Sequence, residues 1–91
     1  MALEFFGIDP NTEKDGSATV WVEEETADLI FQAEIADALL LEKVSSQGWA
    51  PGHSAGVPAH EGVFRIPARM VPFIRKACDA AERRAAGIPE L

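Results

Sequence analysis

Apolar and polar residues alternate in the first third of the chain in a way that predicts a β-hairpin. Residues 19–22, Thr-Val-Trp-Val, are β-branched or aromatic, as is typical of a strand. The polar run 23–28 predicts a turn, and residues 29–35 resume the alternation of a second strand. We therefore expect a hairpin over residues 19–35. The competing interpretation is one long helix over residues 26–46, because apolar residues there also recur at helical spacing.

Two helices and a further strand are predicted in the rest of the chain. Asp37 is a favourable N-cap for a short helix over residues 38–46. A glycine-rich and proline-rich loop leads to a third short strand within residues 62–66. Apolar residues at a spacing of 3.6 then predict a C-terminal helix over residues 68–86. Pro72 falls inside this pattern, so the helix must kink or restart there.

These elements predict an α+β fold, a small and mostly antiparallel sheet of three strands with two helices. The sheet would consist of the hairpin 19–35 and the strand 62–66, with the short helix 38–46 beside it. Three strands cannot cover their own apolar face, so the C-terminal helix 68–86 must pack on it. The predicted core residues are Trp21, Leu29, Phe31, Phe64, Ile66, Met70, Ile74 and Cys78.

The length allows one domain with a modest core. We expect that domain to span residues 18–87, followed by a tail over residues 88–91. Residues 1–17 contain turn chemistry and four apolar side chains near the start. This predicts a loosely tied lead-in that docks on the core or on a partner.

Charge is distributed unevenly along the chain, which has a net charge of −7. Residues 1–61 hold twelve acidic residues and two lysines, whereas residues 62–91 hold six basic and three acidic residues. An acidic majority repels phosphate, so direct binding of nucleic acid through the C-terminal helix is a secondary hypothesis. The single cysteine, the lack of a basic leader and the lack of an 18-residue apolar run favour a cytoplasmic protein without a membrane span.

One motif matches catalytic chemistry. Residues 52–56 read Gly-His-Ser-Ala-Gly, the G-x-S-x-G pattern of hydrolase nucleophiles. That motif requires a strand before the serine and a helix after it, but here Pro51 precedes it and Pro58 follows. Beyond the motif only His60 remains as a base, so a small hydrolase using this loop is the alternative and a flexible loop is favoured.

Other candidate sites are weaker still. His53, His60 and Glu61 lack a fourth ligand and the spacing of a zinc site. Cys78 lies in the apolar stripe of the C-terminal helix, which favours an inert buried thiol over a redox centre. The acidic run 23–25 lacks the alternation of a calcium loop. We therefore expect no catalytic residue, no cofactor and no metal, and a protein that is not an enzyme.

Contact surface remains as the source of function, and we expect a non-catalytic interaction module. Its partner would be a protein, and an exposed β-edge favours a homodimer. An apolar patch rimmed by charges would make the contact, although the charges are also typical of solvated turns and helix faces. The candidate interaction residues are Phe5, Phe6, Glu23, Glu24, Glu25, Trp49, Arg69, Phe73, Lys76 and Arg83.

Three segments resemble a known group of proteins. They are residues 19–29, residues 63–70 (Val-Phe-Arg-Ile-Pro-Ala-Arg-Met) and residues 75–79 (Arg-Lys-Ala-Cys-Asp). They resemble small acidic actinomycete proteins similar to the BldB-like and WhiJ-associated regulators, which are often encoded beside helix-turn-helix repressors. The resemblance covers residues 18–84. It implies a developmental or repressor-linked interaction protein that self-associates, and it transfers no catalytic residue.

The resembled pattern has glycine where this chain has Ala27. A type I turn followed by a bulge requires a left-handed residue at this point. We therefore predict a positive φ at Ala27.

Overall fold

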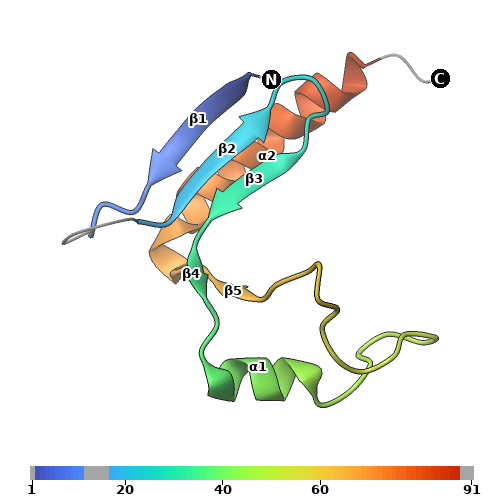
Figure 1. Cartoon of the computed structure of the whole chain (residues 1–91). Coiled ribbons are helices and arrows are strands. Elements are labelled where there is room, and N and C mark those ends of the chain that lie inside the picture. Colours follow the sequence, from blue (N-terminus) through green and yellow to red (C-terminus); the bar gives the residue numbers. More distant parts are fainter. Residues whose placement is uncertain (1, 12–16, 89–91) are drawn as a thin grey trace. The chain divides into compact units, whose positions relative to one another are not determined.

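The structure, a computed structural model, describes residues 2–11 and 17–88 and has an α+β fold (Figure 1). The chain divides into two compact units. The first unit combines Met1–Ala33 with Ile66–Leu91, and the second consists of Glu34–Arg65.

The first unit contains a three-stranded antiparallel sheet in the order β1-β2-β3. Strand β1 spans Leu3–Ile8, β2 spans Thr19–Glu23 and β3 spans Leu29–Gln32. Direct cross-strand pairs align Phe5 with Trp21 and Trp21 with Ile30. The hairpin between β2 and β3 therefore confirms the sequence prediction for residues 19–32, whereas residues 34–35, expected in its second strand, belong to a separate ladder. The long-helix alternative over residues 26–46 is wrong.

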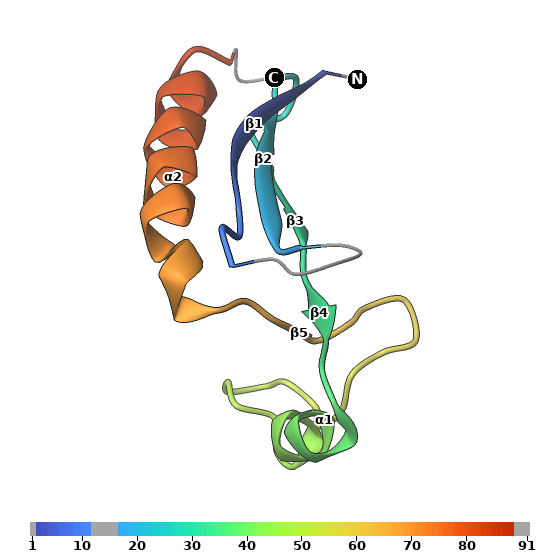
Figure 2. The same ribbon diagram turned by 90° about the vertical axis from the view of Figure 1, so that its left-hand side faces the viewer.

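The C-terminal helix covers one face of this sheet (Figure 2). A 3₁₀ turn, η1, spans Ala68–Met70, and helix α2 spans Val71–Ala86. Pro72 lies in the first turn of α2, so the predicted interruption occurs as a change from 3₁₀ to α geometry. This position is tolerated because the first helical N–H groups have no partner within the helix.

The core lies between α2 and the sheet. Val20 and Val22 of β2 and Ala77 of α2 are fully buried, and Met70 is 1% exposed. Ala18 completes the buried cluster, against which further side chains are partly buried. These partly buried residues are Phe6, Leu29, Ile66, Phe73, Ile74 and Ala81.

The identity of the third strand differs from the prediction. Strand β1 pairs with β2, whereas residues 62–66 contribute only β5, Phe64–Arg65, to a separate ladder. Part of the expected lead-in 1–17 is therefore a strand. The alternation of apolar and polar residues does not reveal this strand, because its register shifts between Phe5 and Gly7, where two phenylalanines are adjacent in the sequence.

The predicted core also needs correction. Trp21 is only half-buried, because the helix covers the face of β2 that carries Val20 and Val22. Phe31 and Phe64 are exposed and Cys78 is half-buried, whereas Met70 is buried as predicted. The error arises because β2 is apolar on both faces, and alternation alone does not indicate which face a helix will cover.

The turn between β2 and β3 confirms the prediction for Ala27. Its φ is 64°, and its N–H donates to the Glu23 carbonyl at 2.9 Å. The Glu23 N–H donates to the Asp28 carbonyl at 2.9 Å. Both bonds close the hairpin and leave Ala27 in the left-handed region that favours glycine.

The second unit contains a short two-stranded ladder and one helix. Strand β4, Glu34–Ile35, pairs antiparallel with β5, and helix α1 spans Ala38–Ser45. Asp37 caps this helix, because its Oδ1 accepts from the Leu40 N–H at 2.8 Å, which confirms the predicted start. No residue of this unit is buried.

Candidate interaction surface

The face of the sheet opposite α2 carries a row of apolar side chains that crosses all three strands. Phe5, Trp21 and Ile30 are direct neighbours in adjacent strands. Successive side chains of a strand point to opposite faces, so Trp21 points away from the helix that covers Val20 and Val22. We call the surface formed by Leu3, Phe5, Ile8, Trp21 and Ile30 the open face.

The bulge in β1 determines which of its side chains belong to the open face. Phe6 and Gly7 lie in the irregular part of the strand, and Phe6 packs against the core. A Cβ added at Gly7 would overlap the ring of Phe73, so α2 approaches the backbone closely here. Phe5, which is 57% exposed, and Ile8 therefore lie on the open face, on either side of the bulge.

Acidic side chains border one end of the open face. Glu23 pairs across the ladder with Leu3, and its Oε1 accepts from the Thr26 hydroxyl at 2.6 Å. Glu24, in the adjoining turn, donates its N–H to the Ala2 carbonyl at 3.0 Å, which ties the turn to the start of β1. With Glu25 and Asp28, this end of the sheet carries four carboxylates.

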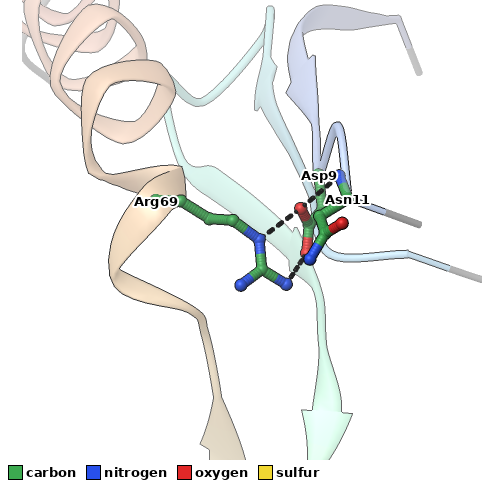
Figure 3. Close-up of polar contacts among 3 residues, drawn as sticks. All are labelled: Asp9, Asn11 and Arg69. Carbon is green, nitrogen blue, oxygen red and sulfur yellow. Dashed lines mark hydrogen bonds and ion pairs between the residues drawn. The ribbon is translucent and has the colours of Figure 1, made fainter.

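An ion pair joins the end of β1 to the start of the helical segment (Figure 3). Arg69 Nε–H donates to Asp9 Oδ1 and Arg69 Nη2–H donates to Asp9 Oδ2, both at 2.6 Å. The Asn11 N–H also donates to Oδ1 at 2.9 Å. The hydrogen bond from Arg69, followed by that from Asn11, lowers the pKa of Asp9, and Asp9 in turn raises the pKa of Arg69.

This geometry gives Arg69 a structural role. Arg69 does not share a free basic face with Lys76 and Arg83, because its guanidinium is held by Asp9. Lys76 and Arg83 are exposed on α2, and Arg84 contacts Glu4 at 3.4 Å. Arg69, Lys76 and Arg83 recur every seven residues and by this spacing would share one helix face, but the ion pair with Asp9 makes Arg69 less available to phosphate.

Two predicted aromatic contacts lie inside the first unit. Phe6 and Phe73 are half-buried and pack against the core, so they are not part of an exposed apolar patch. Sequence reasoning missed Trp21 and Ile30 as members of the open face. The signal that could have revealed them was β2 itself, since a strand that is apolar on both faces is typical of a sheet packed on both sides.

Trp49 belongs to the second unit and is 68% exposed. Trp49 lies just beyond helix α1, and its φ is 60°. Its indole Nε1–H donates to the carbonyl of Val44, inside the helix, at 2.6 Å. The side chain therefore anchors the loop to the end of the helix while much of its ring remains accessible.

The loop that contains the G-x-S-x-G motif does not form a catalytic arrangement in the structure. His53, Ser54 and Glu61 line an open hollow of about 470 Å³, and His60 is not among the lining residues. The His60 side chain is 81% exposed and lies 3.9 Å from Glu61. No hydrogen bond joins Ser54 to either histidine among the residues that the structure describes.

Within residues 2–11 and 17–88, no group of three or more His, Cys, Asp or Glu side chains is placed to hold a metal ion. None of the helices in this part of the chain is long and apolar enough to cross a membrane. Comparisons of the chain with protein-family models, with curated proteins and with solved structures found no match.

Proposed function

We propose that this chain is a non-catalytic, cytoplasmic protein-interaction module whose open face binds a partner protein. The observation that supports this proposal is the apolar row of Phe5, Trp21 and Ile30 on the face that α2 leaves uncovered. Aromatic side chains gathered at the centre of a surface, tryptophan above all, are typical of the residues that dominate binding energy. The acidic end of the sheet supplies the polar rim.

The charges indicate the chemistry of the partner. The charged residues of the turn that borders the open face are acidic, namely Glu23, Glu24, Glu25 and Asp28, although Glu24 also lines a hollow with Arg83 and Arg84 of α2. The basic residues described in the first unit belong instead to η1 and α2. A complementary partner carries an apolar patch bordered by lysine or arginine. The DNA-reading surface of a helix-turn-helix regulator has such a basic border, in agreement with the resemblance noted in the sequence.

Calorimetric titration with helix-turn-helix regulators encoded in the gene's own neighbourhood tests this proposal. We expect binding that weakens as the ionic strength rises, because the acidic border is screened by salt. Trp21→Glu should abolish binding while leaving the unfolding transition close to that of the original chain. Val71→Glu is the matched control, since it places the same charge at an exposed apolar position on α2.

Four results would contradict the proposal. A neighbourhood without any such regulator, or binding that Trp21→Glu leaves unchanged, would refute the assigned partner or surface. A serine-reactive probe that labels the chain but not Ser54→Ala would refute the non-catalytic role. A shift of nucleic acid in a gel at physiological salt, lost in Lys76→Glu with Arg83→Glu, would assign function to the helix instead.

A further inference from the structure

The two edge strands of the first unit differ in how well they are protected from pairing with another strand. Strand β1 carries a charged residue, Glu4, and a bulge at Phe6, both of which discourage pairing. Strand β3 reads Leu-Ile-Phe-Gln, without charge, proline or bulge. The free edge of β3 is therefore the least protected part of this sheet.

The hydrogen-bond pattern shows which backbone groups of β3 point to its free edge. Glu23 faces the bulged residues Ala27 and Asp28 at a hydrogen-bonded position, because its N–H donates to the Asp28 carbonyl and its carbonyl accepts from the Ala27 N–H, both at 2.9 Å. Hydrogen-bonded and non-hydrogen-bonded pairs alternate along an antiparallel ladder. The N–H and C=O groups of Leu29 and Phe31 therefore point away from β2, whereas those of Ile30 point towards it.

The side chains of β3 are also incompletely covered. Phe31 pairs with Val20 and so lies on the same face as α2, yet it is 41% exposed while Val20 is fully buried. Leu29 and Ile30 are half-buried on opposite faces of the strand. A further strand beside β3 would cover side chains on both faces at once.

We propose that a second copy of this chain pairs with β3 through the same strand, in antiparallel orientation about a two-fold axis. Ile30 lies opposite Ile30 of the second copy, and Leu29 lies opposite Phe31. The outward N–H and C=O groups of Leu29 and Phe31 then satisfy one another in two equivalent pairs. The result is a six-stranded sheet with both α2 helices on one face and two open faces joined on the other.

Geometry selects this register. Residues opposite one another in an antiparallel pair share a face, so Ile30 must align with a residue of its own face. Pairing Phe31 with Phe31 also matches the faces, but it would oppose Leu29 to Ala33, which lies outside β3. The proposed register keeps both pairs within the strand and places the Gln32 amide opposite the Asp28 carboxylate.

The register favours a second copy as the occupant, because the edge of β3 is complementary to itself, and the charge of the chain does not oppose the pairing there. A chain with a net charge of −7 repels its copies across most contacts. Strand β3 contributes no charge, so this edge avoids that repulsion, whereas a basic partner would gain nothing from it. The inference does not depend on the proposed function, because it concerns the edge of the sheet and not the open face.

Disulfide trapping tests the register. In a Cys78→Ser background, Ile30→Cys places two thiols at a non-hydrogen-bonded pair, whose Cα atoms lie about 4.5 Å apart, within disulfide range. We expect nearly complete covalent dimer under mild oxidation. Phe31→Cys is the matched control, because its Cα atoms would lie about 8 Å apart. Coupling through residue 31 in preference to residue 30 would overturn the register, and a lack of coupling at both would overturn the pairing.

Sedimentation equilibrium tests the dimer itself without any cross-link. We expect twice the chain mass for the original sequence and a single chain mass for Phe31→Lys, which places a charge at the pairing edge. Phe5→Lys is the control on the other edge strand and should remain dimeric. Trp21→Glu should also remain dimeric, which separates this inference from the proposed function. A monomeric original chain, or a dimeric Phe31→Lys that keeps its unfolding transition, would refute the proposal.

Discussion

The two faces of the three-stranded sheet are both apolar, but among the described residues of the first unit a helix covers only one of them. On the covered face, Val20 and Val22 are fully buried beneath α2. On the open face, Trp21 lies between them in sequence and remains half-buried, and its neighbour Phe5 is 57% exposed. The difference shows that α2 covers only one of the two apolar faces of β2.

This comparison separates residues that hold the fold from residues available for binding. Substitutions on the covered face should lower the free energy of unfolding, because they remove contacts that exist in the isolated chain. Substitutions on the open face should weaken binding of the partner protein and leave unfolding nearly unchanged. The predictions below test this division, in order of decreasing expected effect.

Met70→Ala should cause the largest loss of stability, because removing a side chain that is only 1% exposed leaves a cavity in the core. We expect the free energy of unfolding to fall by about 3 kcal/mol. Phe5→Ala on the open face should cost less than about 1 kcal/mol. Urea denaturation followed by circular dichroism gives both values, and similar losses would contradict the division between the faces.

Gly7→Ala should be the next most destabilising change. The added Cβ would overlap the Phe73 ring, so α2 must shift away from β1. We expect a loss of about 2 kcal/mol from this overpacking. In a Phe73→Ala background the same change should cost much less, because the overlapping ring is gone. Additive losses in the double variant would show that the two residues are not in contact.

Ala27→Gly should stabilise the protein, because its φ of 64° is unfavourable for a residue with a Cβ. We expect a gain of about 1 kcal/mol in the free energy of unfolding. This backbone effect involves neither face and should leave association unchanged. Ala50→Gly serves as the control, since Ala50 has no positive φ and should show no gain.

The Asp9–Arg69 pair should produce the smallest effect, visible as a dependence of stability on pH. Because Arg69 lowers the pKa of Asp9 in the folded protein, the carboxylate stabilises the fold above its ordinary pKa of 3.8. That contribution is lost as the pH falls below 3.8 and through the lower folded pKa. Asp9→Asn should therefore flatten the acid side of the stability profile in a urea titration. An unchanged acid limb in Asp9→Asn would show that the pair does not contribute.

Local signals were sufficient for many elements of the fold. The β2–β3 hairpin, the Asp37 cap of α1, the interruption of the C-terminal helix near Pro72 and the positive φ of Ala27 follow from the sequence. Each depends on residues within a few positions of one another, so propensity and turn chemistry predict the first three, and for Ala27 the glycine of the resembled pattern adds to the turn chemistry.

The candidate site was harder to predict, because it depends on long-range pairing. Phe5 was expected at the surface and Glu23 in the turn, but Trp21 was assigned to the core. Phe6, Phe73 and Arg69 were expected at the surface for contact, and instead they hold the first unit together. No local pattern distinguishes these roles, because they depend on contacts between distant parts of the chain, such as Arg69 with Asp9 and Phe73 with Gly7, which lie about sixty residues apart.

The sequence by itself determined that β2 is apolar on both faces and that one amphipathic helix follows it. Only the tertiary structure decided that β1 completes the sheet and that α2 covers Val20 and Val22 and leaves Trp21 open. The physical reason is the bulge at Phe6, which turns Gly7 towards α2 and permits a close approach on one face alone. A period of two along a strand defines two faces, and packing against the rest of the chain selects between them.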